Sequence, residues 1–174
     1  MKAITMLEIL QHSFKDLADV EHKQPLQRDL LGTQAIISGD YHDGEINLYL
    51  VCNSLDNDLC ATQTQELEYE AEKTYAHEYM HLEQDCMGML AEVPIDQSHK
   101  DYLLTPHEVE AYARVDIPND IRRYGVSPDL QAYAKLLSEK RMMETQQGIT
   151  AYDILRFYHT PIDDYLDKWQ EGIQ

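Results

Sequence analysis

The feature that most constrains the fold of this chain is a long stretch of helix-forming residues that contains no proline. Between Thr62 and about Glu92 the only glycine is Gly88, and the stretch is rich in Glu, Leu, Ala, Met and Gln, which are good helix formers. One set of its positions repeats at helical spacing: Leu67, Ala71, Thr74, Glu78, Leu82 and Cys86. The stretch therefore predicts one long helix over about residues 62–92.

The middle of this predicted helix contains His77-Glu78-Tyr79-Met80-His81, which matches the pattern H-E-x-x-H. Residues four apart project from the same face of a helix, so both histidines can reach one Zn²⁺ ion. Glu78 lies about 100° further round the helix than His77 and points beside the metal, where a general base is needed. The pattern predicts two zinc ligands, His77 and His81, and a catalytic carboxylate, Glu78.

A catalytic zinc ion normally takes three protein ligands, so a third ligand is expected elsewhere in the chain. The extended pattern H-E-x-x-H-x-x-G-x-x-H does not apply, because Gln84 occupies the position of its Gly and Met87 that of its last His. A glutamate on a second helix is the other option. Glu110 is favoured, since Pro106 suits the first turn of such a helix and small residues such as Ala111 allow close packing.

Three other residues, one of them His107, compete with Glu110 for the third ligand position. Glu108 lies two residues earlier and would face another side of the helix, so both glutamates cannot bind one ion without distortion. His99, in the segment 93–105 that connects the two ligand helices, is a weaker alternative.

His77-Glu78-x-x-His81 followed by Glu110-Ala111 resembles the gluzincin arrangement of the zincin metallopeptidases. The run Thr-Pro-His-Glu-Val-Glu-Ala-Tyr-Ala at 105–113 is similar to small metallopeptidase-like proteins of bacteriophages and bacteria. The resemblance covers about residues 75–113. It implies a zinc-dependent peptidase that uses His77, His81 and Glu110 as ligands and Glu78 as general base.

The chain departs from the best-known gluzincins at Arg114, where they carry an acidic residue four positions after the ligand glutamate. Asp116 or Glu108 is therefore expected to support the ligand histidines by hydrogen bonding. Related enzymes often stabilise the oxyanion of the tetrahedral intermediate with a tyrosine or histidine. Tyr102 is the candidate here, with His107 and Tyr112 as alternatives.

The charge of the chain limits its partners. The formal net charge is −18 and the pI about 4.6, so a basic surface for nucleic acid is not expected. A peptide or protein substrate is expected, and basic peptides would be attracted. The alternative is a non-catalytic acidic protein on a zincin scaffold, a DNA mimic or a binder of a host factor. The intact Glu78 favours the enzyme, since only catalysis needs that carboxylate.

The pattern of elements predicts one α+β domain over residues 1–174, mainly α-helical and similar to a minimal zincin. Its upper part, 1–92, is expected to contain a helix over about 3–21, strands at 33–38 and 45–52, a turn at 39–44, and the long helix. The 45–52 strand is expected to cover the active-site helix and to bind the substrate backbone by strand addition.

The lower part, 93–174, is expected to contain helices that wall the cleft. Breaks are expected at Pro118 and at 125–128, a helix from Pro128 to about Gln147 capped by Ser127, a short helix capped by Thr150, and a last one opened by Pro161. No signal peptide or membrane span is recognised, and the three cysteines are an odd number, so a cytoplasmic protein with free thiols is expected.

Overall fold

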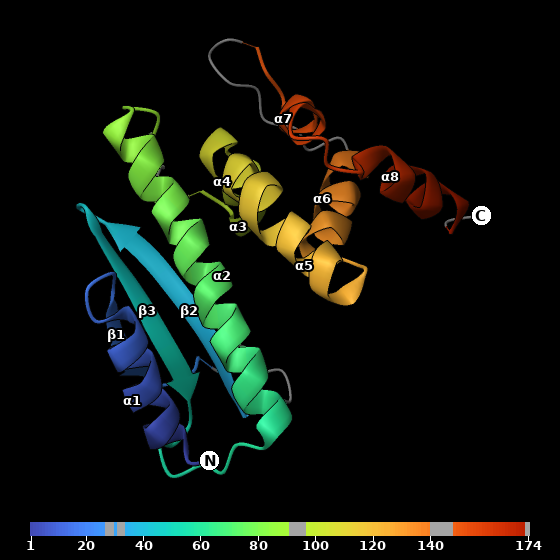
Figure 1. Ribbon diagram of the computed structural model, residues 1–174. Coiled ribbons are helices and arrows are strands. Elements are labelled where there is room, and N and C mark those ends of the chain that lie inside the picture. Colours follow the sequence, from blue (N-terminus) through green and yellow to red (C-terminus); the bar gives the residue numbers. More distant parts are fainter. Residues whose placement is uncertain (27–29, 31–33, 91–96, 140–147, 173–174) are drawn as a thin grey trace. The chain divides into compact units, whose positions relative to one another are not determined.

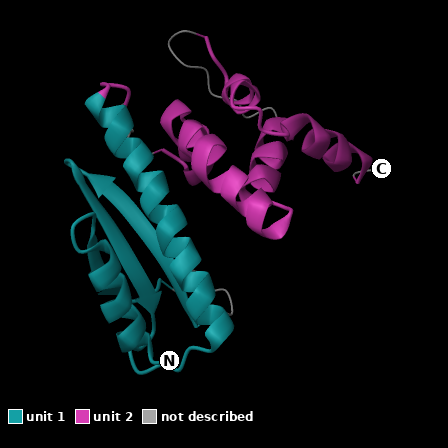
Figure 2. Cartoon of the chain, in the orientation of Figure 1, with its two compact units in different colours: residues 1–86 teal, residues 87–174 magenta. Residues whose placement is uncertain are grey.

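The structure, a computed structural model, describes residues 1–26, 30, 34–90, 97–139 and 148–172. The chain divides into two compact units, Met1–Cys86 and Met87–Gln174, which Figure 2 distinguishes by colour. The first unit contains a small sheet with two helices, and the described part of the second is helical (Figure 1). The predicted α+β class with mainly helical content is confirmed. The unit boundary lies close to the predicted division between residues 92 and 93.

The sheet of the first unit has three strands in the order β1-β3-β2. Strand β3 (Glu45–Cys52) pairs in parallel with β1 (Asp19–Lys23) and antiparallel with β2 (Ala35–His42). The central position of β3 contradicts its predicted role as the substrate-binding strand. Both of its edges already carry ladder hydrogen bonds, whereas strand addition needs a free edge. Within the described sheet, β2 and β1 are the edge strands.

Helices α1 (Ala3–Phe14) and α2 (Ala61–Cys86) pack with the sheet around one apolar core. Leu48 and Leu50 of β3 alternate toward this core and are almost fully buried, as are Leu67 and Ala71 of α2. The long helix is confirmed over Ala61–Cys86, but it ends earlier than the predicted residue 92, since residues 87–90 are not helical. Gly88, with a positive φ of 67°, lies just after its end. Residues 91 and 92 of the predicted helix lie outside the described residues.

The first helix is shorter than predicted, and residues 19–23 form β1 instead of its last turn. The helix ends at Phe14, and the backbone N–H groups of Leu17 and Ala18 both donate to the Phe14 carbonyl oxygen. Leu17 fits the helical spacing but is 54% exposed. The competing structure is the ladder with β3, a long-range partner that helical periodicity cannot reveal.

The turn after the second strand is also shorter than predicted. Strand β2 continues through Gly39 to His42, and only Asp43 and Gly44 form the turn. Both have positive φ, 50° and 88°, as the tight two-residue connection of a hairpin requires. Gly39 therefore belongs to the strand, where a glycine marks close approach of another element.

The described helices of the second unit are α3 (His99–Leu103), α4 (Pro106–Ala111), α5 (Ile117–Tyr124), α6 (Pro128–Ser138), α7 (Ala151–Phe157) and α8 (Ile162–Glu171), with the π-helical segment η1 (Tyr112–Asp116) between α4 and α5. Their shared core includes Leu104, Val109, Leu130 and Leu155, each at most 1% exposed. The predicted continuation of α6 toward Gln147 enters residues 140–147, which lie outside the described residues.

The segment from Pro106 to Tyr124 is helical throughout, so the predicted break at Pro118 is wrong. Proline lacks the N–H of an α-helical hydrogen bond and clashes with the preceding turn. The π-helical segment directly before it widens the backbone, and the Ile117 N–H donates to the Tyr112 carbonyl five residues earlier. Pro118 then lies in the first turn of α5, where it is tolerated.

Most of the predicted helix starts are confirmed. The Ser127 side chain accepts from the Leu130 N–H, and Thr150 forms a reciprocal capping box with Asp153. Thr105 precedes α4 but forms no side-chain capping hydrogen bond, and its hydroxyl donates to the Tyr102 carbonyl oxygen at 2.7 Å. Among the described residues, no helix is both long enough and apolar enough to cross a membrane.

Candidate metal centre

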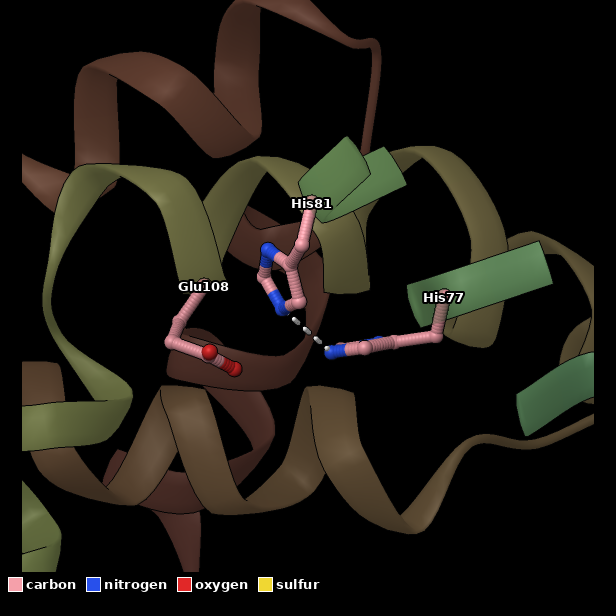
Figure 3. Close-up of side chains that lie close together, drawn as sticks. All are labelled: His77, His81 and Glu108. Carbon is pink, nitrogen blue, oxygen red and sulfur yellow. Dashed lines mark hydrogen bonds between the residues drawn. The ribbon is translucent and has the colours of Figure 1, made fainter. Parts of the chain in front are cut away.

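The two histidines of the H-E-x-x-H pattern lie on one face of α2 with their rings converging. His77 and His81 are 8% and 6% exposed, and their Nε2 atoms are 3.2 Å apart (Figure 3). Two ligand atoms at about 2.0–2.1 Å from a tetrahedral zinc ion would be about 3.3–3.4 Å apart. The spacing of the two ring nitrogens therefore fits a shared metal ion.

The outer nitrogen of His81 is bound by a residue that the sequence analysis missed. Nδ1 of His81 lies 2.8 Å from Oε1 of Gln84, which is fully buried one helical turn further along α2. Hydrogen bonds of this kind fix the orientation and tautomer of metal-binding histidines. The available signal was the i, i+3 spacing from His81, which places Gln84 on the same helix face.

Glu78 is buried between α2 and the backbone of β2. It is 8% exposed, and a Cβ added at Gly39 would lie 3.1 Å from Glu78 Cγ and 2.6 Å from Thr74 Cγ2. Gly39 thus lets the helix approach the strand closely at the position of the expected general base. Glu78 also contributes to raising the pKa of Tyr49 to about 12, although burial of that phenol and its bond to Asp40 are the larger causes.

Glu108 lies in the first turn of α4 and is 2% exposed. The Tyr102 hydroxyl donates a hydrogen bond to its Oε1 atom, and Nε2 of His107 is 4.0 Å from the same oxygen. Tyr102 and His107 also pack edge to face, with ring centroids 6.3 Å apart. The predicted oxyanion donor Tyr102 therefore has its hydroxyl proton directed at a carboxylate, while its role in catalysis stays a prediction.

Glu110, the predicted third ligand, is bound by two other side chains of its own unit. The hydroxyl of Tyr158, the residue directly after α7, donates to Glu110 Oε1 at 2.5 Å, and Arg114 Nη1 lies 3.3 Å from the same oxygen. The Arg114 guanidinium also lies over the Tyr158 ring, 5.6 Å from its centroid. These contacts give Glu110 a structural role that joins α4 to α7.

The other predicted residues lie in different surroundings. His99 is exposed at the start of α3, and Asp116 is buried in the π-helical segment. Burial raises the pKa of Tyr112 well above its usual range, with nearby carboxylates adding to the effect. Cys52, Cys60 and Cys86 are free cysteines, and only Cys52 is buried.

Within the described parts of the chain, His77, His81 and Glu108 form the group of side chains that can hold a metal ion, each with one ligand atom (Figure 3). Two imidazoles and one carboxylate make up a common donor set of catalytic zinc, and the buried Gln84 amide supports one imidazole. The chemistry of these residues therefore fits a zinc ion.

No protein-family model, curated protein sequence or solved structure matches this chain.

Proposed function

We propose that this chain is a zinc-dependent peptidase in which His77, His81 and Glu108 hold the metal ion and Glu78 is the general base. The observation that carries the proposal is the 3.2 Å separation of the two Nε2 atoms on α2, with His81 supported by Gln84. Glu108 replaces Glu110 as the proposed third ligand. It belongs to the candidate metal-binding group, whereas Glu110 binds Arg114 and Tyr158.

The metal ion and Glu78 have different roles in the proposed peptide hydrolysis. When bound, zinc supplies Lewis acidity, which polarises a carbonyl group and lowers the pKa of water. Glu78, one residue after the first ligand, accepts the proton of the attacking water and returns it to the leaving amine. Burial of Glu78 against Gly39 fixes the stem of this carboxylate, so that little conformational freedom is lost during the reaction.

The substrate is proposed to lie along β2 in an extended conformation. This strand is an edge of the described sheet, and its Gly39 is the point where Glu78 approaches the backbone. An extended peptide adds to such an edge through main-chain hydrogen bonds, independently of its sequence. The negative net charge of the chain favours substrates with basic residues.

The proposal is tested by measuring bound zinc and peptide hydrolysis in the same preparations. Protein purified without chelator should contain about one zinc per chain, and His77→Ala should lose it. Glu108→Gln should also lose zinc, whereas the matched variant Glu110→Gln should retain it. Glu78→Gln should retain zinc while hydrolysis of a mixture of basic peptides falls by orders of magnitude.

Each measurement has a result that counts against the proposal. Zinc retained in Glu108→Gln and lost in Glu110→Gln would return the third ligand to Glu110. Normal peptide hydrolysis by Glu78→Gln would contradict the assignment of Glu78 as the general base. Wild-type protein that binds no zinc, even after incubation with the ion, would refute the proposed zinc-dependent peptidase and favour a non-catalytic acidic binding protein.

A further inference from the structure

The two ring nitrogens of His81 have different partners. Nδ1 lies 2.8 Å from Oε1 of Gln84, and Nε2 lies 3.2 Å from Nε2 of His77. An amide oxygen only accepts hydrogen bonds, so His81 Nδ1 must carry the proton. A neutral imidazole carries one N–H, which leaves a lone pair on the other nitrogen.

We propose that Gln84 is a positioning residue that holds His81 in its Nδ1–H tautomer, so that the Nε2 lone pair is ready for a metal ion. This inference rests on the proposed function, in which Nε2 of His81 binds zinc. It assigns a role to a residue that the H-E-x-x-H pattern does not include.

The buried position of Gln84 restricts the tautomer and orientation of the His81 ring. Gln84 is 0% exposed, and both residues belong to the helix α2, so the backbone that sets their spacing is rigid. In a buried position the hydrogen bond is stronger than in water, and leaving the His81 N–H unpaired there would be costly. The tautomer is therefore set before any metal arrives.

The choice of an amide also has an electrostatic reason. Carboxylates are common partners of metal-binding histidines. Glu78 already brings one buried carboxylate to this part of α2, and a second would add like-charge repulsion. A glutamine accepts the same hydrogen bond without adding negative charge.

The same geometry predicts different tautomers for His77 and His81 in the metal-free protein. The His81 Nε2 lone pair faces His77 Nε2 at 3.2 Å, so in the metal-free protein His77 is expected to donate from Nε2. For Nε2 of His77 to bind a metal ion, that proton must move to Nδ1, and the ring stays neutral. Metal binding thus changes the tautomer of His77 and leaves that of His81 unchanged.

The tautomers are measured by long-range ¹H–¹⁵N correlation spectroscopy of the imidazoles in metal-free protein. Wild type should show His81 protonated at Nδ1 and His77 at Nε2, and added zinc should leave both protonated at Nδ1. Gln84→Met, which keeps the length of the side chain but removes the acceptor, should release His81 into a mixture of tautomers. Gln84→Glu should restore the Nδ1–H form, and Gln65→Met, at an exposed position of the same helix, should change nothing.

Zinc affinity provides the second measurement. Gln84→Met should bind zinc about 10–100-fold more weakly than wild type, with recovery in Gln84→Glu. Metal-free wild type with His81 protonated at Nε2 would overturn the inference by itself, as would unchanged affinity in a folded Gln84→Met protein. A wild-type protein that shows the expected tautomers but binds no zinc would instead overturn the proposed function, and with it the metal role of Gln84.

Discussion

The close approach of α2 to β2 at Gly39 predicts that Gly39→Ala is costly. The added Cβ would lie 2.6 Å from Thr74 Cγ2 and 3.1 Å from both Glu78 Cγ and the Asn47 carbonyl oxygen. Carbon atoms pack at about 3.5–4.0 Å, so the helix or the Thr74 side chain must retreat by about 1 Å. Overpacking of this kind costs about 1–3 kcal/mol of unfolding free energy.

Activity is expected to fall more than stability suggests. A retreat of α2 displaces Glu78 from the β2 backbone, and a misplacement of about 1 Å in a reacting group can lower turnover about 10²-fold. His77 and His81 move together with the helix, so their 3.2 Å spacing persists. Gly39→Ala should therefore lose most of its peptide hydrolysis, a larger effect than its loss of stability explains.

A double-mutant cycle separates this contact from a general loss of stability. Thr74→Ser removes Cγ2, the atom nearest to the added Cβ, and should recover part of the cost in the Gly39→Ala background. Gly172→Ala is the control, since its Cβ would meet nothing nearer than 3.5 Å. Urea unfolding followed by far-UV circular dichroism measures all four proteins and the control. An unfolding free energy of Gly39→Ala equal to wild type, or no recovery in the double variant, would refute the reasoning.

Two further predictions concern hydrogen-bonded tyrosines. Tyr102→Phe removes the donor that holds Glu108 and should weaken zinc binding about 10-fold or more; unchanged zinc affinity with reduced turnover would support the oxyanion role instead. The bond to Asp85 raises the pKa of Tyr41 to about 12, and burial does the same for Tyr49, so both phenols should ionise later than free tyrosine in absorbance titrations at 295 nm. The unfolded chain loses these protons at lower pH than the folded protein, so stability should fall between about pH 10 and 12. Asp85→Asn should return the pKa of Tyr41, and not that of Tyr49, toward its ordinary value. An unchanged pKa of Tyr41 in this variant would contradict the prediction.

Local patterns were sufficient where an element depends mainly on its own residues. The long helix and the hairpin strands follow from helix formers and from alternation, and the caps at Ser127 and Thr150 follow from local hydrogen bonds. Strand β1 was missed because its stabilising partner β3 begins more than twenty residues later. Gly39 was assigned to a turn because its reason, the approach of Thr74 and Glu78, is visible only after α2 packs on the sheet.

The same distinction applies to the candidate site. The placement of His77, Glu78 and His81 on one helix follows from spacing alone, since a helix fixes the directions of residues one and four apart. The bond between Gln84 and His81 is equally local, but the H-E-x-x-H pattern ends at His81 and does not include Gln84. The proposed third ligand belongs to another helix, and spacing within α2 cannot identify it.

The choice between Glu108 and Glu110 shows why spacing fails there. The two residues are about 200° apart around a helix, so each carboxylate must have a different environment. Arg114, one turn later, provides Glu110 with a cation, and Tyr158 at the end of α7 donates a hydrogen bond from its hydroxyl. The Glu108 side chain is more buried than that of Glu110, 3% exposed against 12%, and it accepts a hydrogen bond from the neutral hydroxyl of Tyr102. A carboxylate that is already paired with arginine must give up that ion pair when it binds a metal ion, which makes Glu110 the less favourable ligand. On this argument Glu108 is the better ligand for a metal ion, and Glu110 the better residue for holding the helices together.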